Sequence, residues 1–143
     1  MSEQENIRAA SSIFEAWNSG DLSKSAPYEA SNMQVEAPGA PGSLDREQSR
    51  AYNQNFLTAF PGSKFEVTLT VAQGDYVVIN WTITGKNTGP LLSPSGTSIP
   101  PTGKVSTLTG STTSLIKNGK IVHGWTYFDM ASMLTQLGLL PPM

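Results

Sequence analysis

Residues 120–129, KIVHGWTYFD, form a strand candidate that is followed by a helical stretch, MASMLTQL, at residues 130–137. Successive side chains of a strand point to opposite faces. One face therefore combines the only histidine of the chain with two aromatic residues and a strand-end aspartate: His123, Trp125, Tyr127 and Asp129. The other face carries Val122, Thr126 and Phe128. No other segment concentrates so much usable chemistry, and the first face is either the wall of a pocket or the polar side of a sheet.

The composition indicates one folded domain that spans residues 1–143. Hydrophobic residues make up 38% and charged residues 14% of the chain, which is not the composition of a disordered segment. A net charge of -2 without a basic patch argues against nucleic acid or an anionic membrane as a partner. The chain has no cysteine, so disulfides, zinc–thiolate sites and thiol nucleophiles are excluded. Without a signal peptide or a long apolar run, we expect a cytoplasmic protein.

The order of predicted elements is helices first and strands afterwards. Residues 3–19 and 45–60 have the three- and four-residue spacing of amphipathic helices, and Asp45 with Gln48 fits a capping box. Strands are predicted at residues 32–37, from 64 to the turn at 73–75, and at 76–85, 104–117 and 120–129. Asn118-Gly119 is a strong two-residue hairpin signal. Strands joined by tight turns form an antiparallel sheet, so we predict an α+β domain with helices packed on one sheet face.

Two segments remain open. Residues 22–32 contain Pro27 and form either a short helix or a turn. Residues 86–103, rich in glycine, proline and serine, form a long loop, and such loops serve as lids or interface segments or are disordered.

Asp129 has two interpretations of about equal weight. It could cap the helix at 130–137 by accepting a hydrogen bond from the amide of Ser132. Alternatively, it could lie at the floor of a pocket, where desolvation makes a carboxyl group a useful general acid or base.

His123 lies on the same predicted face as Asp129, six residues away. A strand separates them by roughly 20 Å, which is too far for a bonded pair. A lone strand histidine is more often structural than catalytic, and without a second histidine or a cysteine no metal site is predicted. No phosphate-binding glycine motif or GxSxG motif occurs either.

Four stretches cover nearly the whole chain in order: IFEAWNSGDL at 13–22, AFPG at 59–62, WTITG to IPPTGK at 81–104, and NGKIVHGWTYFDMASMLTQLGLLP at 118–141. Together they resemble the SnoaL-like polyketide cyclases, or ester cyclases, within the nuclear transport factor 2-like fold. The last stretch is the most specific. The resemblance implies a cone, in which a curved antiparallel sheet wraps around an apolar cavity that the N-terminal helices close.

The resemblance also implies function. Such cyclases close a ring by intramolecular aldol condensation, need no cofactor or metal, and form homodimers or higher homo-oligomers. Their acid/base aspartate matches Asp129. The partner would be a small apolar organic ligand, and the residues expected to contact it are Trp125, Tyr127, His123, Trp81, Tyr52, Asn53, Phe14 and Trp17.

Three functional hypotheses follow. The first is a cofactor-independent cyclase, or an enzyme of related acid/base chemistry, acting on a small carbonyl compound. The second is a non-catalytic ligand-binding or dimerisation domain of the same fold. The third is an isomerase or hydrolase of this fold, which would need a second carboxylate or a tyrosine directed at the ligand.

Overall fold

The computed structural model describes residues 2–93 and 95–140. The helices are α1 (Glu3–Ser19), the 3-10 helix η1 (Leu22–Tyr28), α2 (Arg46–Ala59) and α3 (Met130–Gln136). The strands are β1 (Glu29–Glu36), β2 (Lys64–Gln73), β3 (Tyr76–Lys86), β4 (Leu91–Leu92), β5 (Ser98–Ile99), β6 (Val105–Lys117) and β7 (Lys120–Phe128). The predicted α+β order is confirmed. Of the segment that the sequence left open, residues 22–28 form η1, whereas residues 29–32 belong to β1.

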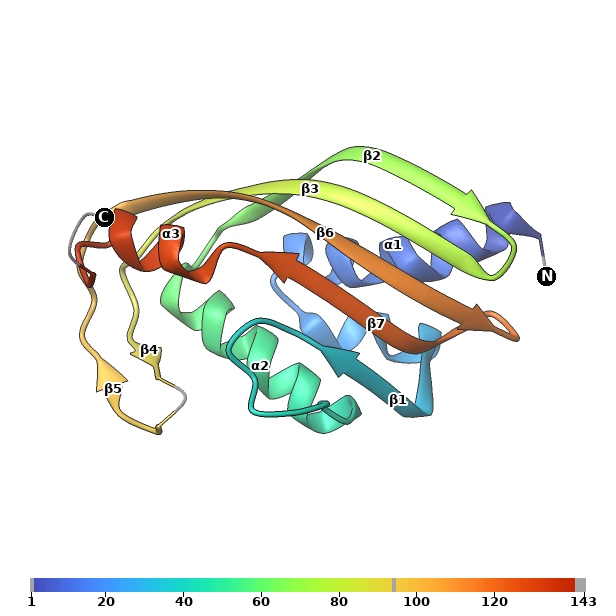
Figure 1. Cartoon of the computed structure of the whole chain (residues 1–143), viewed down its shortest axis with the longest axis horizontal. Helices are drawn as coiled ribbons and strands as arrows, with labels where there is room; N and C mark the ends of the chain where they lie inside the picture. The colour runs from blue at the N-terminus through green and yellow to red at the C-terminus, as the bar shows by residue number, and fades with distance from the viewer. Residues whose placement is uncertain (1, 94, 141–143) are drawn as a thin grey trace.

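The main sheet has the strand order β1-β7-β6-β3-β2 and arches over α1 and α2 (Figure 1). Hairpins join β2 to β3 and β6 to β7. In the second turn, Asn118 and Gly119 have φ values of 52° and 73°, which is the geometry that the Asn-Gly signal predicts. Unlike the other neighbours, β1 runs parallel to β7. The sheet is therefore mixed, because no tight turn links β1 to its partner and dictates an antiparallel direction.

Capping places α2 where the sequence predicts it. The Asp45 carboxylate accepts from the amide of Gln48 at 2.8 Å, while the Gln48 side chain accepts from the amide of Asp45 at 3.0 Å. This reciprocal pair satisfies two backbone donors that the helix itself cannot use. The helix then packs Phe56, Leu57 and Ala59 into the interior beneath the sheet.

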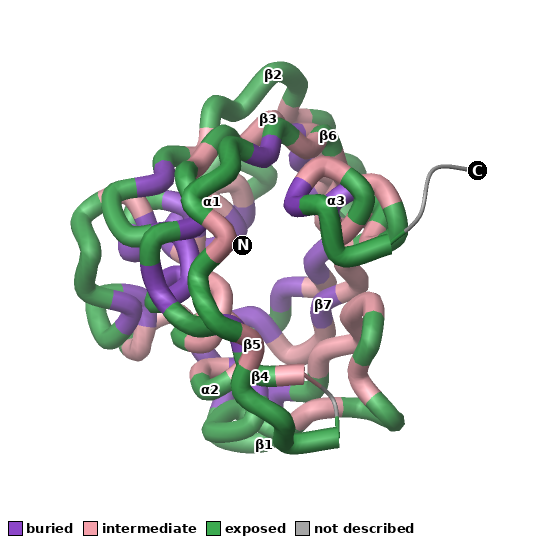
Figure 2. The backbone as a smooth tube through the Cα atoms, turned by 90° about the vertical axis from the view of Figure 1, so that its left-hand side faces the viewer, coloured by how far each residue is buried: buried purple, intermediate pink, exposed green. Residues whose placement is uncertain are grey.

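The core lies between the inner, concave face of the sheet and the helices. Its buried side chains come from α1, β1, β3, β6 and β7: Ala9, Ala10, Phe14, Met33, Val77, Ile79, Trp81, Ile116 and Ile121. In Figure 2 the buried parts of the tube face a common interior. This arrangement leaves the outer face of the sheet without a covering layer in the described chain.

A β-bulge in β2 changes which side chains face outward. The pairing with β3 shifts between Val67 and Leu69, so the regular alternation expected after Phe65 does not persist. Leu69 and Val71 point outward, where they are 51% and 49% exposed. The outer face of the sheet thus gains apolar residues that a regular strand would have turned inward.

The segment after β3 is ordered by one side chain. Asn87 is buried, and its amide nitrogen donates to the backbone oxygens of Ala59 at 3.1 Å and Gly89 at 2.9 Å. Its Oδ1 accepts from the backbone amide and the hydroxyl of Thr102, each at 2.9 Å. Between these anchors, β4 and β5 form a small hairpin whose Leu91 packs against α3 and the end of α2. None of the helices in the described ranges is both long and apolar enough to cross a membrane.

Candidate active site: an apolar cavity with few polar groups

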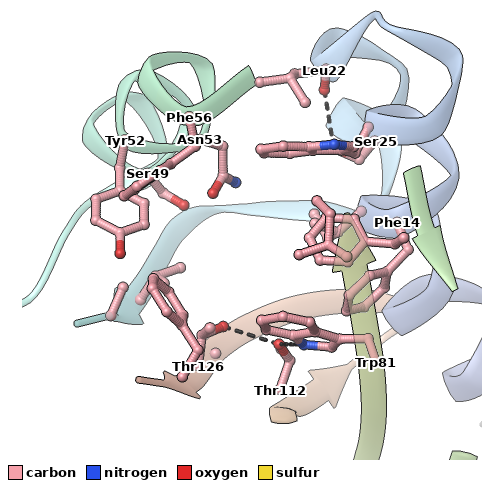
Figure 3. A pocket seen from close by; sticks show the side chains of 18 of the residues that line it. Phe14, Leu22, Ser25, Ser49, Tyr52, Asn53, Phe56, Trp81, Thr112 and Thr126 are labelled. Atoms are coloured by element: carbon pink, nitrogen blue, oxygen red, sulfur yellow. Dashed lines mark hydrogen bonds between the residues drawn. The ribbon is translucent and has the colours of Figure 1, made fainter. Parts of the chain in front are cut away.

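A cavity of about 150 Å³ lies between the inner sheet face and helices α1, η1 and α2 (Figure 3). Its lining is mainly apolar and aromatic, with Phe14 and Trp17 from α1, Phe56 from α2, and Phe65 and Trp81 from the sheet. Phe65 makes edge-on contacts with three of the other rings, those of Phe14, Trp17 and Trp81, at centroid distances of 5.0 to 5.1 Å. These contacts pack the four rings together on one side of the cavity.

The adjoining part of the sheet wall comes from alternate residues of β6 and β7. Because paired residues of antiparallel strands share a face, Ser114 lies beside Gly124 and Thr112 beside Thr126. Phe128 completes this row at the end of β7. The face of β7 that lines the cavity is therefore the one with small and apolar side chains.

The prediction that His123, Trp125 and Tyr127 line the cavity is wrong. They lie on the outer face of the sheet, where Tyr127 is 64% exposed. The His123 ring stacks on Trp125 at a centroid distance of 4.1 Å, and its Nε2 contacts the carboxylate of Glu36 on β1. The error has a physical cause: alternation separates the two faces correctly, but it does not say which one turns toward the helices.

Asp129 is exposed and is not among the residues that line the cavity. It is the N-cap of α3, and its Oδ1 accepts from the amide of Ser132 at 3.0 Å. The expectation that this carboxylate lies at the cavity floor is wrong, because the alternation that turns Phe128 inward turns Asp129 outward. A catalytic role for Asp129 stays a prediction.

The other predicted residues do line the cavity: Phe14, Trp17, Trp81, Tyr52 and Asn53. Trp17 Nε1 donates to Ser63 Oγ at 3.2 Å, and the Tyr52 hydroxyl donates to the backbone oxygen of Pro38 at 2.6 Å. Burial raises the pKa of Tyr52 above its ordinary value of 10.0, so the phenol stays protonated and keeps this bond. Their role as ligand contacts stays a prediction.

The carboxylate of this cavity is not among the site residues predicted from the sequence. Glu29 opens β1 and is 5% exposed, and it is the only carboxylate among the described residues that line the cavity. Its Oε1 accepts from Arg50 of α2 at 2.8 Å, and its Oε2 accepts from the Ser25 hydroxyl at 2.8 Å. The available signal was an acidic residue between the apolar Tyr28 and Ala30, in a segment whose structure the sequence left open.

A second polar group joins three strands on the cavity wall. Trp81 Nε1 of β3 donates to Thr112 Oγ1 of β6 at 3.0 Å, and this oxygen lies 3.0 Å from Thr126 Oγ1 of β7 (Figure 3). Apart from Glu29 and Arg50, Tyr52 is the only titratable residue that lines the cavity in the described chain. The described residues contain no group of three or more His, Cys, Asp or Glu side chains that could hold a metal ion.

The family model described as SnoaL-like polyketide cyclase matches residues 7–137 of this chain. Among solved structures, IdmH, a candidate polyketide cyclase from Streptomyces antibioticus, is 28% identical, with 93% of this chain and 98% of its own covered and a TM-score of 0.78. AclR, a candidate hydroxylase from Streptomyces galilaeus, is 23% identical, with coverages of 99% and 90% and a TM-score of 0.84.

A candidate SnoaL-like polyketide cyclase from Jannaschia sp. CCS1 is 19% identical, with coverages of 98% and 95% and a TM-score of 0.84. The two structures below 25% identity support the cone fold. A comparison with curated proteins gives no significant match.

Proposed function

Because the chain belongs to the SnoaL-like polyketide cyclase family, we propose that it binds a small, largely apolar carbonyl compound in this cavity and transforms it by acid/base chemistry. The cavity supports this proposal in its composition. Large rings provide apolar contact, and a few polar groups are available to orient a ligand. The similarity to IdmH, a candidate polyketide cyclase, points to the same reaction class.

The observation that carries the proposal is the position of Glu29. A single buried carboxylate faces an apolar cavity, and two donors, Arg50 and Ser25, hold it in one orientation. A carboxylate held beside a bound ligand is suited to removing a proton from the carbon next to a carbonyl group. Water exclusion and positioning by the aromatic walls would supply much of the rate advantage.

The proposed ring closure moves one proton out and back and forms one carbon–carbon bond. Glu29 takes the proton from the carbon atom, and the electron pair of that C–H bond becomes an enolate. The enolate carbon forms a bond to a second carbonyl carbon of the same molecule, whose C=O π electrons move to oxygen. The new alkoxide then takes the proton back from Glu29, so that the carboxylate is regenerated and no co-reactant is consumed.

The first prediction concerns Glu29→Gln. We expect the wild-type protein to accelerate exchange of the α-hydrogens of 2-tetralone with D₂O, followed by proton NMR, and the variant to lose roughly 100-fold or more of this rate. Glutamine keeps the size of the side chain but cannot accept the proton. Thermal melting separates this loss from unfolding, since the variant also weakens the partly buried ion pair with Arg50.

Asp129→Asn is the matched control, because asparagine preserves the N-cap. We expect its exchange rate to stay close to that of the wild type. The opposite outcome, a fast Glu29→Gln and a slow Asp129→Asn, would overturn the role of Glu29 and support the aspartate that the family resemblance implies. Binding of 2-tetralone without any acceleration of exchange would favour a non-catalytic ligand-binding domain.

The second prediction concerns assembly, since we also propose that the protein forms a homodimer through the outer face of its sheet. Register places Val71, Val78, Thr113 and Trp125 in one row across four strands, with the half-exposed Leu69 and Tyr76 beside it. Such a patch on an uncovered face is typical of an interface.

Val71→Glu should therefore shift sedimentation from dimer to monomer. Leu92→Glu, at a residue that is similarly exposed (53%) on the β4–β5 hairpin, should leave the dimer intact. A monomeric wild type would contradict the proposal.

A further inference from the structure

The hydrogen-bond chain on the cavity wall has one more hydrogen than it uses. Its donors are the indole N–H of Trp81 and the hydroxyls of Thr112 and Thr126, which together supply three hydrogens. The two bonds of the chain, each 3.0 Å long, use two of them. Neither hydroxyl makes another side-chain hydrogen bond within the described residues, so one O–H hydrogen is left over.

Both possible orientations leave this hydrogen on the cavity wall. If Thr112 donates to Thr126, the O–H of Thr126 remains. If Thr126 donates to Thr112, which also accepts from Trp81, the O–H of Thr112 remains. Both threonines line the cavity, and Figure 3 shows their oxygens together beside the Trp81 ring. One O–H donor is thus left over whichever threonine donates to the other.

The surroundings of this donor are largely apolar. Phe128 follows Thr126 on β7 and Gly110 precedes Thr112 on β6, and the other cavity-lining hydroxyls of these two strands are those of Ser106 and Ser114. Gly110 allows the arrangement, because a Cβ there would lie 2.3 Å from two ring atoms of Trp81. With glycine at this position the Trp81 ring has room beside β6, and its Nε1 donates to Thr112 Oγ1. Gly110 is therefore a positioning residue for the hydrogen-bond chain of Trp81, Thr112 and Thr126.

We propose that the Thr112–Thr126 pair is a binding site for a ligand oxygen that can only accept hydrogen bonds, such as the oxygen of a ketone, aldehyde or quinone. The inference rests on the proposed function only in that a ligand occupies this cavity. A wall with a spare donor favours a ligand that accepts its hydrogen and discriminates against one of the same shape that cannot. The same donor would stabilise the negative charge that develops on this oxygen during enolisation.

The test compares two probes of nearly equal shape, 2-acetylnaphthalene and 2-isopropenylnaphthalene, in which a CH₂ group replaces the carbonyl oxygen. Dissociation constants are measured by equilibrium dialysis. We expect the wild-type protein to prefer the ketone by about tenfold. In the variant T112V/T126V/W81F, which removes all three donors, this preference should disappear, whereas T112S/T126S should retain it. T113V, on the adjacent residue of β6 but the outer face, is the matched control.

A second measurement, by infrared spectroscopy, uses only the wild-type protein. The infrared stretch of 2-acetylnaphthalene labelled with ¹³C at its carbonyl should lie at lower frequency in the protein than in hexane, because a hydrogen bond weakens the C=O bond. Equal binding of both probes to the wild type, or a hexane-like stretch, would overturn the oxygen site and leave the proposed cavity function standing. If neither probe binds, the proposed function itself fails.

Discussion

The two faces of β7 differ in an unexpected direction: the face with the reactive side chains points away from the cavity, and the face with small side chains lines it. The outer face carries His123, Trp125 and Tyr127, whereas the inner face carries Gly124 and Thr126 before Phe128. A cavity inside a curved sheet requires space, and small residues on the concave wall provide it. Large polar aromatic residues fit the convex side, where side chains diverge. The comparison teaches that the cavity of such a curved sheet is located by small side chains on the concave face. Reactive side chains on a strand do not by themselves locate it.

The largest effect on stability should come from the inner face of β7, where Phe128 lies next to the outward-facing Tyr127. Phe128→Ala removes a ring that packs against Phe56 and Trp81, at centroid distances of 6.2 Å in both cases, and should cost about 3 kcal/mol of unfolding free energy. Tyr127→Ala should change it by less than about 0.5 kcal/mol, because that side chain is mostly exposed. Urea denaturation at a concentration where the protein is monomeric measures both. Equal losses would break the distinction between the faces.

Much of the fold follows from local signals. The hairpin at Asn118-Gly119 and the cap at Asp45 depend on residues close in sequence, so the sequence predicts them. The parallel pairing of β1 with β7 joins distant segments, and no local pattern encodes it. Glu29 was missed for the same reason, since its partner Arg50 comes from another element. For Asp129, local sequence allowed both a cap and a catalytic acid, and only the tertiary structure shows that it is the cap.

The next prediction contrasts two glycines on the inner face. At Gly110 an added Cβ would lie 2.3 Å from the ring of Trp81 and 2.7 Å from the backbone oxygen of Tyr127. Gly110→Ala should therefore cost about 2 kcal/mol by overpacking. At Gly124 the closest atom would be Val35 Cγ2 at 3.8 Å, an ordinary contact. Gly124→Ala should be neutral or add about 0.5 kcal/mol, because alanine restricts the unfolded chain. The reverse order in thermal or urea unfolding would contradict the packing of Trp81.

The smallest effect concerns Tyr52, the cavity phenol. Tyr52→Phe removes the hydrogen bond to Pro38 and should cost about 1 kcal/mol near neutral pH. Because burial raises the pKa of Tyr52 above 10.0, the folded state favours the protonated phenol. Its contribution is thus complete below pH 10 and is lost as the pH rises above it. The unfolding free energy of the wild type should fall more steeply above pH 10 than that of Tyr52→Phe; parallel curves would show that the phenol is not buried.

The parallel edge pair also has a kinetic consequence. The contact between Glu36 and His123 joins residues 87 positions apart, whereas the β2–β3 and β6–β7 hairpins close through short turns. Closing a long loop costs more conformational entropy than closing a short turn, and this cost comes before any contact forms. We therefore expect β1 to dock after the hairpins. Glu29 is the first residue of β1, and the cavity therefore acquires its carboxylate only when this last pairing is complete. A folding intermediate with its hairpins formed would bind apolar molecules before it could act on them.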